Sequence, residues 1–130
     1  MRAVKKEDAA AIAELELELF PDNCFNEKTL EREISMGAGV VVYDASVLVG
    51  YALIRWDWEY IDITRLGVRS SHRGRGIATR MLVEILGNAS LDVMLCVDKD
   101  NVGAMRLYQS HGFEIKAQLQ RSWVMRRATF

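Results

Sequence analysis

The segment from Val68 to Thr79 constrains the fold most, because it joins a strand-like stretch to a helical one through a short loop of arginines and glycines. Before it, Ile61 and Ile63 alternate with polar residues, which predicts a half-buried strand. After it, the stretch Ile77 to Leu86 predicts a helix, which Gly87 would close. A strand that leads into a helix in this way is typical of a sheet with helices packed on it.

The rest of the chain shows the same alternation of strand-like and helical stretches. Strands are predicted over residues 1–4, 40–43, 47–55, 61–68, 91–97, 113–115 and 122–125, and helices over 8–20, 26–37, 77–86 and 101–112. In the first helix, residues 14–19 alternate with period two as a strand would, but their Leu and Glu content favours a helix that stops before Pro21. The order of elements predicts an α/β (α+β) fold with a mixed central sheet.

Length and charge exclude several classes of protein. The chain has 130 residues and no Ser- or Gly-rich linker, so we expect a single domain over residues 1–130. Lys+Arg number 17 against Asp+Glu 18, a formal net charge of -1, which speaks against nucleic acid or a membrane surface as a partner. With no secretory signal and no metal spacing between Cys24 and Cys96, we expect a cytoplasmic protein that binds no metal.

The loop between the predicted strand and helix has the features of an anion site. Gly74 and Gly76 let the backbone approach a ligand closely, and the start of the helix offers unpaired N–H groups. Arg73 and Arg75 add charge-assisted donors. Between Ile63 and Val83 there are five arginines and no acid. From the loop alone, a CoA or nucleotide phosphate site and a solvated Arg-Gly turn both stay open.

A second motif near the C-terminus predicts a capped helix with a Gly-Phe exit. It consists of Asn101, Ala104, Leu107, Tyr108, Gly112 and Phe113. With the run Arg73-Gly74-Arg75-Gly76-Ile77-Ala78, this motif resembles the GCN5-related N-acetyltransferase (GNAT) superfamily. The resemblance implies the GNAT fold, a mixed sheet splayed at the cofactor site between the strand ending at Val68 and the strand 91–97, with helices on both faces. It also implies that acetyl-CoA lies in the splay as the co-substrate.

The resemblance further implies which residues bind acetyl-CoA. Backbone groups of Leu66, Gly67 and Val68 would hold the pantetheine arm and polarise the thioester carbonyl. The pyrophosphate would be wrapped by Arg73, Gly74, Arg75, Gly76, Ile77, Ala78 and Thr79. Asn101 would contact the cofactor arm, and Tyr108 would point at the sulfur, where it would serve as the general acid.

The general base has several candidates. Asp62 falls on the strand where histone-type members of the superfamily carry a glutamate base, and its shorter side chain would act through a water. The alternation of Asp62 with isoleucines on either side is equally typical of the polar face of a half-buried strand. Asp57 and Glu59 are alternative carboxylates. Cys96, where some N-terminal acetyltransferases carry a glutamate, is interpreted as a packed thiol rather than a nucleophile.

The predicted function is transfer of acetyl from acetyl-CoA to a primary amine by direct attack. Residues 1–35 hold nine acids against five bases, so a negative wall would suit a small cationic amine or a peptide amine, whereas a solvated helix face explains the same charges. Trp56, Trp58 and Tyr60 would form an aromatic lip for the amine or pack in the core. A protein N-terminal acetyltransferase of the ribosomal-protein type and a non-catalytic acyl-CoA sensor are the alternatives, and a homodimer stays open.

Overall fold

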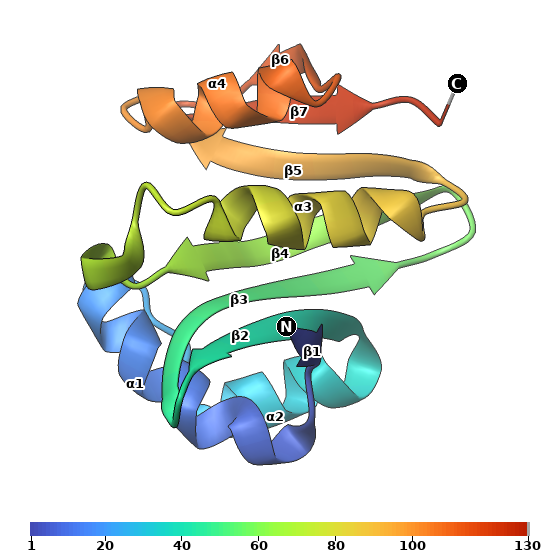
Figure 1. The fold of residues 1–130 in the computed structure, drawn as a ribbon. Coiled ribbons are helices and arrows are strands. Elements are labelled where there is room, and N and C mark those ends of the chain that lie inside the picture. Colours follow the sequence, from blue (N-terminus) through green and yellow to red (C-terminus); the bar gives the residue numbers. More distant parts are fainter. Residues whose placement is uncertain (130) are drawn as a thin grey trace.

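The structure is a computed structural model that describes residues 1–129 (Figure 1). Its strands are β1 (Arg2–Ala3), β2 (Ala38–Asp44), β3 (Val47–Trp56), β4 (Tyr60–Val68), β5 (Asp92–Asp98), β6 (Glu114–Gln118) and β7 (Ser122–Arg127). Its helices are α1 (Ala9–Leu19), α2 (Glu27–Met36), α3 (Ile77–Gly87) and α4 (Val102–Ser110), with short 3-10 turns η1 (Lys6–Asp8) and η2 (Ser70–His72). The predicted order of strands and helices is confirmed. No helix in the described part is long and apolar enough to cross a membrane.

Helix α1 forms in spite of its alternating sequence. Ile12, Leu15 and Glu16 are fully buried, and their spacing of three and one residues is that of one helix face. Leu17, which the alternation would place beside Leu15, is exposed. The helix ends before Pro21, with the Phe20 amide donating to the Glu16 carbonyl at 2.7 Å. The helical periodicity therefore brings one carboxylate, that of Glu16, into the interior.

A single sheet of seven strands has the order β1-β2-β3-β4-β5-β7-β6. All neighbouring strands are antiparallel except β4 and β5, which are parallel. The pairing of β4 with β5 begins at Tyr60 with Asp92 and ends at Ile63 with Leu95, although both strands continue further. The expected splay is therefore present, and it opens at the C-terminal ends of β4 and β5.

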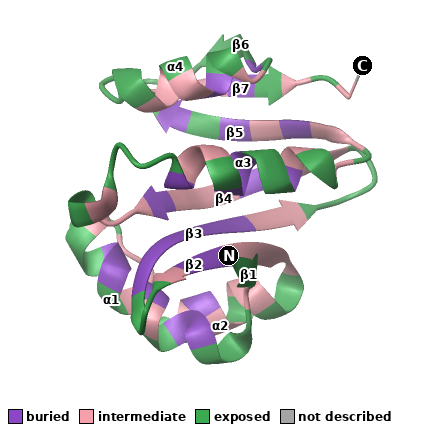
Figure 2. Ribbon diagram, in the orientation of Figure 1, coloured by how far each residue is buried: buried purple, intermediate pink, exposed green. Residues whose placement is uncertain are grey.

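Helices cover both faces of the sheet, as expected. On one face, α1 and α2 bury Ile12, Leu15 and Leu30 against β2 and β3. On the other face, α3 and α4 bury Met81 and Tyr108 against the centre of the sheet. β3, which lies between the two cores, is buried along most of its length (Figure 2). Each fully buried aliphatic side chain contributes about 1.5–3 kcal/mol to folding, so these two cores hold the helices on the two faces of the sheet.

A bulge in β4 decides which side chains share a face near the splay. Leu53 of β3 pairs with Arg65, and the next residue of β3 pairs with Ile63, so Thr64 has no partner in the register. In a regular strand, Asp62 and Arg65 would point to opposite faces because they are three residues apart. The extra residue changes this alternation, because a bulge shifts every later side chain by one position. Asp62 and Arg65 consequently both lie on the face that α1 and α2 cover.

Candidate active site

A cavity of about 740 Å³ lies at the splay, between the start of α3 and the start of α4. We call it the larger cavity. It is lined by Leu19, Phe20, Leu66, Gly67, Val68, His72, Arg73, Gly74, Gly76, Ile77, Ala78, Thr79, Asp98, Asn101, Gly103, Ala104, Leu107 and Tyr108. The structure thus brings the residues predicted to bind acetyl-CoA to one cavity, with the exception of Arg75, which does not line it.

The loop before α3 presents its backbone to this cavity. Gly74 and Gly76 have φ angles of 77° and 78°, in the left-handed region that favours glycine, and a Cβ added at either would meet nothing within 4 Å. No side chain caps α3, and its first intrahelical acceptor, the Gly76 carbonyl, bonds the Arg80 amide at 3.0 Å. The amides of the first helical turn are therefore free for an anion, and the helix dipole favours one there.

The edge of β4 offers further backbone donors inside the splay. The Arg69 amide donates to the Val49 carbonyl of β3 at 2.8 Å. Because backbone groups alternate in direction along a strand, the amides of Val68 and Leu66 point away from β3. β5 no longer pairs with β4 at this point, so these amides face the larger cavity, which both residues line. Such a row of N–H groups can stabilise a developing oxyanion.

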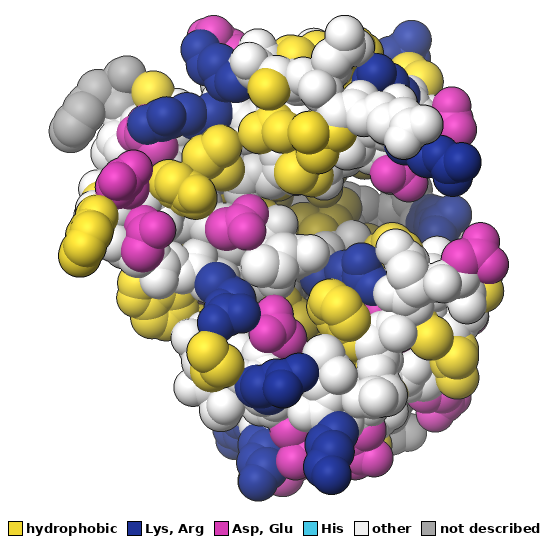
Figure 3. Space-filling model, turned by 180° about the vertical axis from the view of Figure 1, so that it is seen from behind, with side chains coloured by type: hydrophobic (Ala, Val, Ile, Leu, Met, Phe, Trp, Pro, Cys, Tyr) yellow, Lys and Arg dark blue, Asp and Glu magenta, His cyan; other side chains and the backbone are white. Residues whose placement is uncertain are grey.

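A second cavity, of about 190 Å³, adjoins the first on the side of the segment between α1 and α2, and we call it the smaller cavity. It is lined by Phe20, Asn23, Ile63, Thr64, Arg65, Leu66, Leu95, Cys96, Val97, Asp98, Asn101 and Tyr108. Phe20, Leu66, Asp98, Asn101 and Tyr108 line both cavities. Seen from behind, the surface is hollowed between the half that holds β5, β6 and β7 and the half that carries α1 and α2 (Figure 3).

Tyr108 lies where the two cavities meet. Its side chain packs edge-on against Phe113, with ring centroids 5.7 Å apart, and the residue is 7% exposed. Burial raises the pKa of the phenol above its usual value, so the hydroxyl is protonated at neutral pH. Within residues 1–129, no group forms a hydrogen bond with this hydroxyl. The proton is therefore available to a ligand in the cavities.

Asn101 has two roles in this structure. Its side chain accepts a hydrogen bond from the Ala104 amide at 3.3 Å and so caps α4, as an N-cap asparagine does. The same residue lines both cavities. The N-terminus of α4, the helix that carries Tyr108, is thus capped by a residue of the cavity lining.

Asp62 is half-buried on β4, but it lines neither cavity. Burial raises the pKa of its carboxyl, and the charge of Arg55 opposes that rise. Thr64, two residues further along the strand, does line the smaller cavity. Burial, and then the charge of Asp62, raise the pKa of Cys96, which lines the smaller cavity, so Asp62 lies near that cavity without lining it.

The alternative carboxylates are in different positions. The Asp57 carboxylate accepts hydrogen bonds from the amides of Glu59 and Tyr60 at 2.7 and 3.1 Å, and so stabilises the turn between β3 and β4. Glu59 is exposed in the same turn. Trp56 and Trp58 are 55% and 87% exposed, so core packing is wrong for both, and none of the three predicted lip aromatics lines either cavity.

Two residues at the end of β5 were not assigned correctly from the sequence. Cys96 is exposed and lines the smaller cavity, so the interpretation as a packed thiol is wrong. β7 still pairs with β5 at this residue, through Val124, but β4 has already diverged on the other side. Asp98, which was not a candidate, lines both cavities. Asp98 is two residues after Cys96 in the same strand, so both side chains lie on the same face of the sheet. This spacing is the signal that could have identified Asp98 from the sequence.

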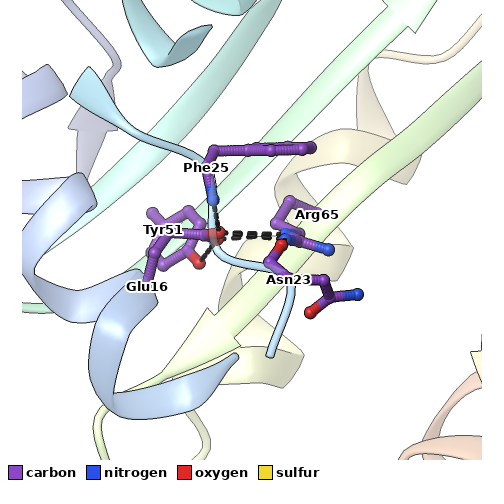
Figure 4. A network of polar contacts seen from close by, with 5 residues as sticks. All are labelled: Glu16, Asn23, Phe25, Tyr51 and Arg65. Carbon is purple, nitrogen blue, oxygen red and sulfur yellow. Dashed lines mark hydrogen bonds and ion pairs between the residues drawn. The ribbon is translucent and has the colours of Figure 1, made fainter. Parts of the chain in front are cut away.

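Glu16 is the centre of a buried polar network (Figure 4). It is 0% exposed and accepts hydrogen bonds from the Tyr51 hydroxyl, the Phe25 amide at 2.9 Å, and both Nε and Nη2 of Arg65 at 3.0 Å. The ion pair with Arg65 compensates the carboxylate charge inside the protein. Burial raises the pKa of the Tyr51 hydroxyl, and its hydrogen bond to Glu16 raises it further.

The acids of the first helices do not form a free negative wall. Five of the nine are held in ion pairs: Asp8 with Arg2, Glu16 with Arg65, Glu18 with Arg69, Glu31 with Lys6 and Glu33 with Arg55. Asp8 and Glu16 are buried, so a solvated helix face does not describe them either. Both interpretations of these charges are therefore incomplete, because much of the charge is neutralised within the fold.

Comparison with known sequences identifies the family. The family model described as "Acetyltransferase (GNAT) family" matches residues 9–113. The N-alpha-acetyltransferase RimI of Mycobacterium tuberculosis is 36% identical to this chain over 121 residues, which cover 86% of this chain and 76% of that protein.

Two solved structures share the fold. The ribosomal-protein-S18-alanine N-acetyltransferase from Escherichia coli superposes with a TM-score of 0.85 at 15% identity, covering 98% of this chain and 91% of the other. Arabidopsis thaliana Naa50, in complex with the bisubstrate analogue CoA-Ac-MVNAL, superposes with a TM-score of 0.79 at 21% identity, covering 98% and 99%. With the family match over most of its length, the chain belongs to the GNAT family of acetyltransferases.

Proposed function

We propose that this acetyltransferase transfers the acetyl group of acetyl-CoA to the N-terminal α-amino group of a peptide or protein. The observation that carries the proposal is the junction of two cavities at Tyr108, one with free backbone donors and one bordered by the segment between α1 and α2. The M. tuberculosis relative is named as an N-alpha-acetyltransferase, and Naa50 is in complex with a CoA-peptide conjugate, which supports a peptide acceptor. The paired acids of α1 and α2 remove the main argument for a small polycation.

The larger cavity has the donor set that acetyl-CoA requires, and acetyl-CoA would supply the activated acetyl thioester there. The free amides of Ile77, Ala78 and Thr79 would bind the pyrophosphate, because the glycine turn before them carries no side chains that could obstruct it. Arg73 would add a charge-assisted contact. Arg75 lies outside the cavity, so it would act through its charge rather than by contact. The amides of Leu66 and Val68 would donate to the acetyl carbonyl.

Tyr108 would be the general acid. As the amine nitrogen forms its bond to the acetyl carbon, the carbon–sulfur bond breaks, and the departing thiolate takes the phenolic proton. The raised pKa keeps this proton on the oxygen until the thiolate develops. Tyr108 borders both cavities, so one side chain can serve the sulfur while the amine approaches from the smaller cavity.

A carboxylate would remove the proton that the amine loses. Asp62 would do so through a water, since it lies on the strand that leads to the smaller cavity without lining it. Its raised pKa makes it a stronger base than an ordinary aspartate. Asp98 is the alternative, because it lines both cavities and no donor within residues 1–129 pairs with its carboxylate.

The experiment is to incubate the protein with acetyl-CoA and a short peptide that carries a free α-amine and one internal lysine, and to locate the acetyl group by tandem mass spectrometry. The proposal expects acetylation at the α-nitrogen. Acetylation at the lysine alone would overturn the choice of acceptor. Acetylation of a polyamine but of no peptide would favour a small cationic amine. Acetyl-CoA binding without any transfer would favour a sensor.

A further inference from the structure

Arg65 is a charged side chain at the wall of the smaller cavity. It belongs to β4 just beyond the point where β5 leaves, and the bulge at Thr64 turns it toward α1. Its side chain is 14% exposed, and the residue lines the smaller cavity. The catalytic account above uses no group of this side chain, so its place beside the acceptor needs a separate explanation.

The guanidinium is held rigidly from three sides. Nε and Nη2 bond to buried Glu16, and Nη2 also donates to the Asn23 carbonyl at 2.7 Å (Figure 4). The rings of Phe20 and Phe25 each lie 4.2 Å from the guanidinium carbon. These contacts fix both the arginine and the segment between α1 and α2, to which Asn23 and the two rings belong. A donor fixed in this way loses little entropy when it binds a ligand.

One arm of the guanidinium has no partner. Within residues 1–129, no group accepts a hydrogen bond from Nη1 of Arg65, although Nε and Nη2 are fully used. No buried polar side-chain atom in the described part lacks a partner, so Nη1 is reached by solvent. Arginine stays charged in proteins, so both N–H groups of Nη1 remain donors at any working pH.

The ligand that suits this donor is a neutral carbonyl. Glu16 already compensates the charge of Arg65, so the pair as a whole has little net attraction for a carboxylate. A peptide acceptor carries such a carbonyl three bonds from its α-nitrogen, whereas a simple amine has none. Arg65 and Tyr108 line the same small cavity, so the α-nitrogen and the first carbonyl of one acceptor can meet both.

We propose that Nη1 of Arg65 donates a hydrogen bond to the first peptide carbonyl of the acceptor, and so makes the enzyme prefer a peptide to an amine without a carbonyl. This inference rests on the proposed function. Arg65 is then an acceptor-binding residue, and its fixed geometry sets the specificity. On this account, the hydrogen bonds to Glu16 and Asn23 hold Arg65 so that its Nη1 can donate to an acceptor in the smaller cavity.

The test compares kcat/KM for a peptide with that for the amine that has the same first side chain but no carbonyl. The wild-type protein should prefer the peptide, and Arg65→Lys, which keeps a cation for Glu16 but lacks Nη1, should reduce this preference roughly 10- to 100-fold. Arg69→Lys is the matched control, because Arg69 lines neither cavity, and it should leave the preference unchanged. An equal loss for both acceptors in Arg65→Lys would overturn the proposal.

A second measurement needs no variant, and so holds even if Arg65→Lys fails to fold. Replacing the first carbonyl of the peptide by a methylene group should cost the wild-type protein the same factor. If the wild-type protein acetylates peptides but tolerates this replacement, the role of Arg65 is wrong while the proposed function stands. If it acetylates no peptide at its N-terminus, the proposed function itself fails.

Discussion

Asp62 and Arg65 lie on the same face of β4 because the bulge at Thr64 inserts one residue between them. Arg55, which pairs with Asp62 in the sheet, bonds to Glu33 of α2, and Arg65 bonds to Glu16 of α1. A carboxylate and a guanidinium thereby lie on the face of the sheet that α1 and α2 cover, while α3 packs on the opposite face. Tyr108 lines both cavities at the splay.

Tyr108→Phe should lower kcat by about 10²- to 10⁴-fold, the usual contribution of a general acid, because the departing thiolate loses its proton donor. The dissociation constant of acetyl-CoA should change little, since the ring and its contact with Phe113 remain. Turnover is measured by thiol release and binding by calorimetry. Tyr60→Phe is the matched control, because Tyr60 lines neither cavity. Unchanged turnover in Tyr108→Phe would remove this residue from the mechanism.

The identity of the base is decided by comparing Asp62→Asn with Asp98→Asn. A base must be deprotonated to act, and burial raises the pKa of Asp62, so kcat/KM should rise with pH through a value above that of an ordinary aspartate. In Asp62→Asn this rise should be absent and the rate low at every pH. If Asp98→Asn shows that behaviour and Asp62→Asn keeps the wild-type profile, Asp98 is the base.

Gly76→Ala should weaken acetyl-CoA binding and destabilise the protein by about 1–2 kcal/mol, because alanine is strained at a φ of 78°. The added methyl group meets nothing within 4 Å, so the effect comes from the backbone and not from a clash. Gly87→Ala is the matched control, since it too has open space but lacks a left-handed φ. It should leave binding unchanged and raise stability slightly. Equal effects of the two variants on binding would contradict the role of the loop.

Glu16→Gln should destabilise the fold by about 3 kcal/mol, measured by urea unfolding, because Arg65 and Tyr51 keep their buried positions while the carboxylate charge is lost. Glu14→Gln, on the exposed side of the same helix, should cost less than about 0.5 kcal/mol. A cost for Glu16→Gln as small as that for Glu14→Gln would mean that the network does not hold α1 against the sheet.

The lowered pKa of Asp92 should make the stability of the fold depend on pH in the acid range. Hydrogen bonds from the Thr129 amide and hydroxyl, and then from Arg126, lower the pKa of Asp92 from 3.8 to about 2. A lowered pKa stabilises the fold above the unfolded value and loses that effect as the carboxylate is protonated. Asp92→Asn should therefore melt below the wild type at neutral pH, with the difference disappearing between about pH 4 and pH 2. Exposed Asp100→Asn should show no such difference.

The sequence predicts those parts of the molecule that depend on local patterns. The glycine turn before α3, the Asn101 cap of α4 and the order of strands and helices follow from short-range signals, and the structure contains them. The splay came from the family resemblance and not from periodicity, and the register of β4 with β5 agrees with it.

The remainder depends on contacts between distant segments. In the sequence, Glu16 looks like any of the acids of the first helices. Only the fold brings Arg65, 49 residues later, beside it. Cys96 resembles a core residue because its strand is apolar, yet it is exposed beside the point where β4 diverges from β5. The bulge at Thr64 has no signal in the residues themselves, yet it decides which side chains lie on the face of the sheet that α1 and α2 cover.

The most direct test of the central claim is thiol release from acetyl-CoA by the purified protein, with one peptide supplied either with a free N-terminus or with that N-terminus already acetylated. Both forms should contain no lysine, so that the α-nitrogen is the single primary amine. The account predicts stoichiometric release of CoA with the free peptide and none with the blocked one. Release that is equal with the two peptides, or no release with either while acetyl-CoA binds, would contradict it.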